Sequence, residues 1–254
     1  MELAILNAMV LCDEFIIADN GSEDRSPETG KRLAEQHSNI TYYRIDSPEQ
    51  SQDLIQRYIN TDTFIFAVDG DEIYDPNRLE QFRVQLVKGE YNDYWMTYGN
   101  VLHCAEIDES AGMAKGYLAR PCRSMTKLYN FSLIKAWEGP CSERLHGGTV
   151  TFHDPESDQK RMRFDFDSSW EDSVFRCLHT VFLSRSSMEK GENSNRLNIH
   201  DQLMMSRKRK LLNFVLRLLR ISSNSKTKND YYMRGELVKK QVSDFFSHCS
   251  TRNL

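Results

Sequence analysis

Acidic and small residues end two short apolar stretches of the chain, in a pattern that can bind a phosphorylated ligand through a metal ion. The first stretch ends at Asp19 and Asn20. The second ends at Asp69, Gly70 and Asp71. Two carboxylates separated by one small residue can reach a divalent cation and a ribose together, and hard cations take oxygen ligands. A simple Asx turn is the alternative for Asp19 and Asn20. For Asp69 and Asp71, the alternative is a loop that initiates a helix.

The residues ahead of these acids predict the elements that position them. Residues 14–19 (EFIIAD) and 63–69 (TFIFAVD) are short apolar runs, which are typical of buried strands. Residues 40–45 (ITYYRI) predict a third strand, and helices are expected after Ser26 and over residues 47–60. This alternation predicts an α/β fold with a mainly parallel sheet flanked by helices. Because ligands bind beyond the carboxyl ends of such strands, both acidic groups are expected to face one crevice.

Two segments carry a resemblance to a known family. FIIADNGSEDRS, followed about fifty residues later by FIFAVDGDEIYDP, resembles the family 2 glycosyltransferases of the GT-A fold. In that family the two strand ends read D-D/N-G-S-x-D and then D-x-D-(D/E)-x-x-x-P. This chain supplies the matching positions at Asp19, Asn20, Gly21, Ser22 and Asp24, and then at Asp69, Asp71, Glu72 and Pro76. The resemblance covers roughly residues 1–150, and it implies a GT-A fold with a mixed, mainly parallel sheet and flanking helices.

The resemblance implies metal-dependent transfer of a sugar, with inversion, from a nucleotide-diphosphate donor to a glycan or lipid-linked acceptor. It assigns Asp19 and Asn20 to the donor nucleotide, with Asp19 at the base. Asp69 would contact the ribose or the metal. Asp71 would hold a Mn²⁺ or Mg²⁺ ion that bridges the diphosphate oxygens.

A catalytic carboxylate is expected further along the chain. Residues 137–145 (WEGPCSERL) resemble the family's acceptor loop, which leads to a catalytic acid. Inverting transfer needs a carboxylate to take the proton of the acceptor hydroxyl, and the resemblance assigns this role to Glu143. Ser142 stands where many relatives have histidine. Glu138 as the base, or a surface salt bridge at Glu143, are the alternatives.

Cationic side chains complete the candidate site. Arg120, Arg123 and Lys127 form a basic cluster ahead of the acceptor loop, from which Arg123 is expected to meet the diphosphate. A solvated basic face is the alternative. His179 is the candidate for a late metal or phosphate ligand, as in some GT-A enzymes, and a packed helix histidine is its alternative.

The chain departs from the family pattern at its beginning. Residues 1–12 match the helix that normally follows the family's first β-strand, so the first strand itself is missing from the match. Loss of a central strand is expected to leave unpaired backbone groups on its neighbours and to weaken nucleotide binding. A catalytically inactive GT-A-like binding or scaffold protein is therefore the second functional hypothesis. A methyltransferase is disfavoured because no G-x-G loop precedes an acidic strand end.

The middle of the chain predicts further elements. Residues 75–87 open with an acid and proline and predict a helix, and residues 94–103 predict a strand. Residues 105–117 show no clear period and predict a loop. A hairpin is expected between residues 149–153 and 161–166.

The C-terminal region differs in charge from the remainder. Residues 200–254 carry a local net charge of plus 8, although the whole chain carries minus 4. Residues 207–221 predict a helix with a basic flank, and a second helical stretch is expected near 231–247. We therefore predict a domain over residues 1–190 and a basic helical extension over 191–254. The extension suggests peripheral contact with a membrane, and no nucleic-acid partner is expected.

Composition places the protein in a broad class. Hydrophobic residues make up 39% and charged residues 28%, a balance typical of a soluble globular protein. The six cysteines show no C-x-x-C pair, which fits a reducing cytoplasm. No stretch reaches the roughly 18 apolar residues of a membrane-spanning helix. The expected location is the cytoplasm, with membrane association at the inner face through the extension.

Overall fold

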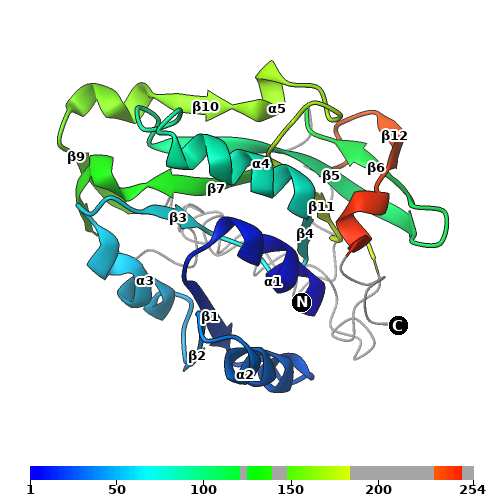
Figure 1. Ribbon diagram of the computed structural model, residues 1–254, viewed down its shortest axis with the longest axis horizontal. Coiled ribbons are helices and arrows are strands. Elements are labelled where there is room, and N and C mark those ends of the chain that lie inside the picture. Colours follow the sequence, from blue (N-terminus) through cyan, green and yellow to red (C-terminus); the bar gives the residue numbers. More distant parts are fainter. Residues whose placement is uncertain (121–124, 139–147, 184–231, 248–254) are drawn as a thin grey trace, which may run out of the picture.

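The computed structural model describes residues 1–120, 125–138, 148–183 and 232–247 (Figure 1). Its α-helices are α1 (Glu2–Ala8), α2 (Ser26–Gln36), α3 (Gln50–Ile55), α4 (Pro76–Val87) and α5 (Phe164–Asp167). Its strands are β1 (Phe15–Asn20), β2 (Ile40–Ile45), β3 (Phe64–Phe66), β4 (Glu72–Tyr74), β5 (Met96–Asp108), β6 (Met113–Leu118), β7 (Met125–Asn130), β8 (Ile134–Glu138), β9 (Thr149–Phe152), β10 (Arg161–Arg163), β11 (Arg176–His179) and β12 (Leu237–Gln241). Short 3-10 helices include η1 (Met9–Leu11), η2 (Gln56–Tyr58), η3 (Phe131–Leu133), η4 (Pro155–Gln159) and η6 (Ser243–Phe246).

A parallel strand pair and one covering helix begin the fold. β1 pairs with β2 in parallel, from Phe15 opposite Ile40 to Asn20 opposite Ile45. Helix α2 packs on this pair, and an added Cβ at Gly30 would lie only 2.7 Å from the Tyr42 ring. Glycine therefore allows the helix to approach the strands closely. The predicted strands and helix of this region are confirmed.

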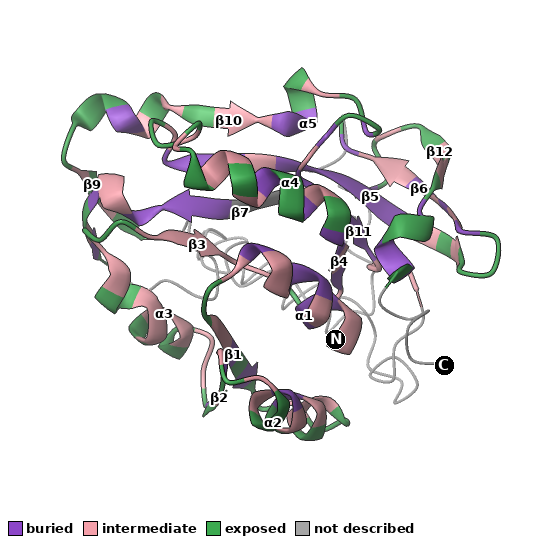
Figure 2. Cartoon of the chain, viewed as in Figure 1, coloured by how far each residue is buried: buried purple, intermediate pink, exposed green. Residues whose placement is uncertain are grey.

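The main sheet is built around β5, its longest strand. β5 pairs in parallel with β10 and β11, and antiparallel with β6 and β7. Figure 2 shows β5 and β7 as mainly buried. Helix α4 packs on this sheet through Leu79 and Phe82, whose side chains are fully buried. It begins as predicted: Asp75 accepts a hydrogen bond from the Arg78 amide, and proline follows at the first helical position.

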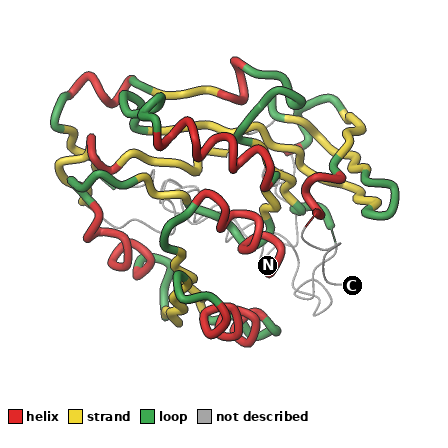
Figure 3. The backbone as a smooth tube through the Cα atoms, viewed as in Figure 1, coloured by secondary structure: helices red, strands yellow, loops and turns green. Residues whose placement is uncertain are grey.

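β3 does not join β1 in one parallel sheet. It pairs antiparallel with β7, so the β1–β2 pair and the large sheet are separate among the described residues. Figure 3 shows the small pair set apart from the larger sheet. The expected mainly parallel order is therefore wrong, because most pairs of the larger sheet are antiparallel, whereas the expected mixed character of the sheet is confirmed.

Two local predictions between residues 94 and 166 are wrong. The expected loop over residues 105–117 is the end of β5 and most of β6, joined by a turn with Gly112 at φ +62. Across this hairpin Lys115 pairs with Glu106 at 3.2 Å on the exposed face. Such cross-strand charge pairs stabilise a hairpin, but they do not give the apolar alternation by which a strand is predicted. The expected hairpin does not form either, because β9 pairs with β8 and β10 pairs with β5.

The end of the described chain belongs to the main body. β12 extends the sheet by pairing antiparallel with β6, so the helical stretch expected near 231–247 is wrong. Its burial alternates along the strand, and the following Phe245 is fully buried and stacks on Trp170. Asn7 donates hydrogen bonds to the carbonyls of Tyr74 and Phe245, which ties α1 to this region. The predicted helix over 207–221 lies outside the described residues.

No helix in the described part of the chain combines the length and the apolar character needed to cross a membrane.

Candidate active site

Pairing of β4 with β11 brings Asp71 beside His179. Glu72 lies opposite His179 in this ladder, so the residues at the two strand ends are neighbours. Thr180 donates to the Asp71 carbonyl from its amide at 2.9 Å and from its hydroxyl at 3.1 Å. The Asp71 Oδ2 atom lies 3.3 Å from the His179 Nε2 atom. Two residues 108 positions apart in the sequence thus form one polar pair.

A second histidine lies next to His179. His103 lies opposite His179 in the parallel ladder between β5 and β11, and the two Nδ1 atoms are 2.9 Å apart. Both histidines are buried, and the Tyr232 ring packs against them at centroid distances of 4.5 and 5.2 Å. One Nδ1 atom must carry the shared proton while the other accepts it.

The Asp71–His179 pair has a geometry that suits a shared divalent cation. Ligand bonds of about 2.1 Å at a right angle place two donor atoms about 3 Å apart, close to the 3.3 Å between Asp71 Oδ2 and His179 Nε2. The Asp71 side chain is 23% exposed, so its carboxylate can meet a ligand from solvent. Within the described residues, no three His, Cys, Asp or Glu side chains form a metal-binding group. The pair therefore fits a cation whose other ligands come from substrate phosphates and water.

Glu72 braces the turn that carries Asp69 and Asp71. Its amide donates to the Asp69 carbonyl at 3.0 Å, and its carboxylate accepts from the Asp69 amide at 3.2 Å. The Tyr74 hydroxyl also donates to Glu72, at 3.1 Å. Burial, and then the charge of Glu72, raise the pKa of Tyr74 well above its ordinary value. Tyr74 therefore stays protonated and remains a donor to this turn.

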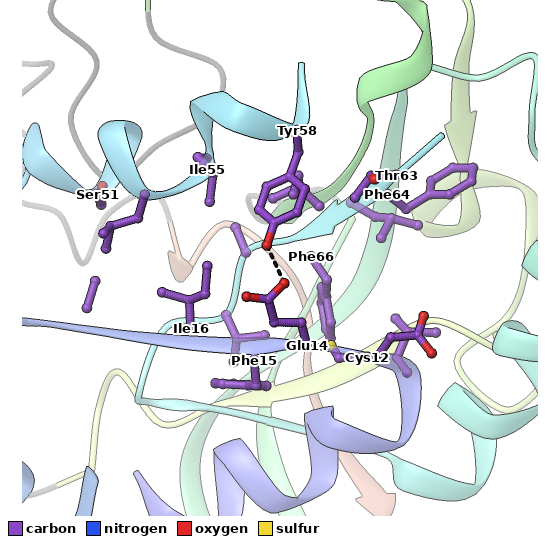
Figure 4. Close-up of a pocket in the computed structure, with 18 of the residues that line it drawn as sticks. Cys12, Glu14, Phe15, Ile16, Ser51, Ile55, Tyr58, Thr63, Phe64 and Phe66 are labelled. Carbon is purple, nitrogen blue, oxygen red and sulfur yellow. Dashed lines mark hydrogen bonds between the residues drawn. The ribbon is translucent and has the colours of Figure 1, made fainter. Parts of the chain in front are cut away.

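A cavity of about 900 Å³ is lined by residues of β1 and β3, and its lining includes Asn20, Asp69 and Gly70. It therefore brings together residues from both predicted acidic loops. Figure 4 shows a part of its lining, with Tyr58 and Glu14 hydrogen-bonded to each other.

Asp19 is not among the residues that line this cavity. Its carboxylate caps a turn by accepting from the Ser22 amide at 3.0 Å, and it also accepts from the Tyr42 hydroxyl at 2.7 Å and from Arg44 at 3.2 Å. Burial raises the pKa of Asp19, but these hydrogen bonds and the Arg44 charge lower it more, so the pKa lies below its ordinary value. The carboxylate of Asp19 therefore stabilises its own loop, although its bond to the amide three residues on is not the two-residue bond of an Asx turn.

The sequence comparison supplies the deciding observation. Residues 4–119 match the model of the family described as glycosyl transferase family 2. The match supports a family 2 glycosyltransferase domain over residues 4–119, a little under half of the chain. This domain implies a GT-A fold, and a nucleotide-sugar donor and an acceptor as its substrates in general. No curated protein matches the chain.

Only some of the remaining predicted site residues belong to the described part of the chain. Arg123 and Glu143 lie outside the described residues, as does the side chain of Lys127. Arg120 pairs with Asp165 at 3.4 Å, which supports a structural role for this arginine. Glu138 is exposed at the end of β8.

Sequence reasoning missed residues that support the transferase site. His103 is the last residue of the strand predicted over 94–103, so its place on a strand could be predicted. Its contact with His179 could not, because that contact depends on the register between β5 and β11. Tyr232 falls in a segment expected to be helical. Thr180 follows His179 directly and holds the backbone of Asp71, a contact that no local pattern indicates.

Proposed function

We propose that this protein transfers a sugar from a nucleotide-diphosphate donor to a glycan or lipid-linked acceptor, with inversion and with a bound Mn²⁺ or Mg²⁺ ion. The observation that carries the proposal is the Asp71–His179 pair, 3.3 Å apart, in a chain whose residues 4–119 match the family 2 glycosyltransferases. Asn20 and Asp69 line a cavity that also includes Gly70, the residue before Asp71. Carboxylate and imidazole ligands of this kind suit a cation that also binds diphosphate oxygens.

The proposed donor site divides the binding between two loops. Asp71 and His179 hold the cation, and Asp69 contacts it or the ribose. Asn20 contacts the nucleotide from the cavity, Asp19 holds the turn that follows Asn20, and Arg123 pairs with the diphosphate. A divalent cation bound there would offset the negative charge that develops on the departing diphosphate.

Glu143 is the proposed general base. Its carboxylate takes the proton of the acceptor hydroxyl while that oxygen forms a bond to the anomeric carbon. The bond from the anomeric carbon to the donor phosphate oxygen breaks, and the electron pair leaves with the nucleoside diphosphate. Attack from the face opposite the leaving group inverts the anomeric configuration.

Donor hydrolysis with Mn²⁺ tests the proposal. The wild-type chain is compared with Asp71→Ala, and with Asp93→Ala as a matched change at an exposed acid that does not line the cavity. We expect Asp71→Ala to lower the hydrolysis rate at least 100-fold and Asp93→Ala to leave it unchanged. Calorimetry with UDP-sugars, GDP-sugars and Mn²⁺ identifies the donor. Equal rates for wild type and Asp71→Ala would leave the acid without a catalytic role.

A binding or scaffold protein without turnover is the second candidate function. The observation that favours it is the separation of β1 from β3, because the nucleotide cavity then lacks a continuous sheet as its wall. This alternative predicts no donor hydrolysis by the wild-type chain at any metal concentration, while donor or acceptor binding by calorimetry persists.

We also propose a cytoplasmic location with peripheral membrane contact through residues 207–221. Deleting residues 200–254 would remove β12, which belongs to the main sheet, so a charge substitution is the better test. Lys208→Glu with Lys210→Glu should reduce co-sedimentation with phosphatidylserine vesicles several-fold, while Lys31→Glu with Lys88→Glu should not.

A further inference from the structure

Phe166 of α5 is a large apolar side chain that lies at the surface. It is 68% exposed, more than any other aromatic residue in the described part of the chain. The other phenylalanine of α5, Phe164, is buried and packs edge-on against Phe82. Figure 2 shows that α5 passes from buried to exposed along its length. Single exposed apolar side chains are common, so the surroundings of Phe166 decide whether it has a function.

Arg120 covers one face of the Phe166 ring. Its guanidinium carbon lies 4.6 Å from the ring centre. Because Phe166 is nevertheless mostly exposed, the opposite face of the ring is open to solvent. The Arg120 side chain is 44% exposed, and its Nε atom pairs with Asp165 at 3.4 Å. Its two terminal nitrogen atoms have no partner among the described residues, so they can donate hydrogen bonds to a ligand beside the ring.

A buried carboxylate fixes Arg120 and a second arginine. Asp165, whose side chain is fully buried, accepts from the Arg163 Nε atom at 2.9 Å and from its Nη2 atom at 2.8 Å. The Oδ2 atom of Asp165 also accepts from Arg120. The Arg163 guanidinium lies over the Tyr98 ring, 4.1 Å from its centre. Side chains that are already fixed in this way lose little conformational entropy when a ligand binds.

The described charges at this surface balance. Arg120 and Arg163 are cationic, whereas Asp165 and the exposed Asp167 are anionic. Hydrogen bonds to Asp165 raise the pKa of Arg163, and the nearby charges of Asp165 and Asp167 raise it further. A nucleic acid or an anionic membrane needs a surplus of positive charge, which these residues do not supply. One exposed ring among charged groups is also too small for an apolar protein interface.

The arrangement of an arginine over an aromatic ring repeats along β10. The Arg161 guanidinium lies 5.9 Å from the centre of the Trp95 ring and pairs with Asp158 at 3.6 Å. Arg161 and Arg163 are two residues apart on one strand, so they point to the same face at a spacing of about 7 Å. The surface therefore offers polar contacts to a ligand that extends beyond a single ring.

We propose that this surface binds a neutral oligosaccharide, and we name it the Phe166 platform (Tyr98, Arg120, Arg163, Phe166 and Asp167). One sugar ring packs its C–H face on the open face of Phe166, because the face of an aromatic ring is negative and attracts weakly positive hydrogens. Hydroxyl groups of that sugar accept from the terminal nitrogens of Arg120 and donate to the Asp167 carboxylate. A hydroxyl group both donates and accepts, so it suits a surface that carries both kinds of partner.

The Phe166 platform is separate from the proposed donor site. None of its five residues lines the cavity, and Figure 1 shows β10 and α5 away from β4, the strand that follows Asp71. A glycan held there would bind through sugars distant from its reacting end, so the platform would favour long acceptors over short ones. That role rests on the proposed function. Oligosaccharide binding itself needs neither donor nor metal, so the two proposals can fail separately.

Saturation-transfer NMR with the full chain tests the platform in the absence of donor and metal. The probes are maltohexaose, xylohexaose and the hexamer of N-acetylglucosamine. We expect at least one of them to bind with a Kd of about 1 mM, and Phe166→Ala to weaken that binding at least about tenfold. Phe166→Trp keeps an aromatic face and should retain binding. Tyr43→Ala is the matched control, because Tyr43 is an exposed aromatic residue of β2 that does not line the cavity.

An acidic residue gives a second, independent readout. Asp167→Ala removes the proposed acceptor of a sugar hydroxyl and should weaken binding several-fold, whereas Asp93→Ala at another exposed acid should not. All these substitutions are at exposed positions, so the Tm should stay close to that of wild type.

Several outcomes would overturn the platform. These are binding that is unchanged in Phe166→Ala, or no binding of any of the three probes at about 10 mM. Tighter binding of an acidic hexasaccharide through Phe166 would indicate a polyanion site instead, and Phe166-dependent binding of phosphatidylserine vesicles would indicate a membrane site. If the probes bind through Phe166 but donor hydrolysis stays absent, the platform stands and the transferase proposal fails. Donor hydrolysis without any binding of the probes would leave the transferase proposal standing and reject the platform.

Discussion

His103 constrains the proton of His179, because their Nδ1 atoms lie 2.9 Å apart. If a cation takes the Nε2 lone pair of His179, the Nδ1 of His179 must carry the proton and donate it to His103. If Nε2 instead donates to Asp71, the Nδ1 of His179 must accept from His103. The two rings therefore change tautomer together. A neighbour that fixes the tautomer of a ligating histidine commonly affects metal affinity.

We predict that His103→Leu weakens Mn²⁺ binding about tenfold in the presence of UDP. The leucine removes the partner of the His179 Nδ1 atom, whereas His103→Asn keeps a polar atom near that position and should lose less. Electron paramagnetic resonance of free Mn²⁺ measures the affinity. His153→Leu serves as the control, since His153 is exposed and contacts Asn60. Affinities within twofold of wild type for His103→Leu would exclude this positioning role.

Asp19 gives a prediction that depends on pH. Tyr42→Phe removes a hydrogen bond to its carboxylate and should raise the pKa of Asp19 toward the ordinary value of about 4. Because the folded-state pKa is depressed, Asp19 stabilises the fold above pH 4 and loses this contribution as pH falls through the folded-state pKa. The variant should therefore be about 1 kcal/mol less stable at pH 7, and this difference should shrink as the pH falls below about 4.

Urea unfolding at pH 7, 5 and 3 measures this difference. Tyr43→Phe is the matched control, because Tyr43 is its exposed neighbour on β2. A stability difference for Tyr42→Phe that is the same at every pH would show that the lost hydrogen bond does not act through the charge of Asp19.

At the scale of elements, β6 depends on a glycine. Gly116 lies opposite Cys104 in the ladder with β5, next to a shift in register. A Cβ at this position would lie 2.2 Å from the His103 carbonyl oxygen, a distance that real contacts do not reach. Backbone atoms cannot rotate away as a side chain can, so one strand must move.

Gly116→Ala should therefore lower the free energy of unfolding by about 2 kcal/mol or more. Gly70→Ala is the matched control, because its Cβ would lie 3.7 Å from Met1, an ordinary contact. We expect that control to stay within about 0.5 kcal/mol of wild type by urea denaturation. Equal effects of the two substitutions would mean that β5 and β6 can separate without loss of stability.

Local signals decided which elements could be predicted from the sequence. β1, β2 and α4 follow from apolar runs, a capping acid and a proline, and all act within a few residues. β6 and β12 were missed because their Lys-containing sequences become strands only through partners elsewhere in the chain. The same limit applies to the site. The motif around Asp69 and Asp71 was visible, but the contact with His179 depends on strand register, which spacing alone does not supply.

At the scale of the whole molecule, the described end of the predicted C-terminal extension packs into the core of the preceding residues. Val242, Phe245 and Phe246 bury their side chains in one cluster with Leu102, Trp170 and Leu178 of the main body. The Arg176 guanidinium, which pairs with buried Asp75, lies 5.5 Å from the Phe245 ring. Residues 232–247 therefore share a core with Leu102 of β5 and Leu178 of β11, which directly precede His103 and His179.

A chain that ends at residue 231 should consequently fail to fold as a cooperative unit. Loss of β12 and η6 would expose Leu102 and Leu178, and would leave Trp170 without the ring on which it stacks. Removing a single large core side chain costs about 3–5 kcal/mol, and a typical domain has only about 5–15 kcal/mol of stability. Differential scanning calorimetry should show no sharp transition for this chain, whereas a chain that ends at residue 247 should melt like the full-length protein. A 231-residue chain with the full-length Tm would instead support an independent extension after residue 190.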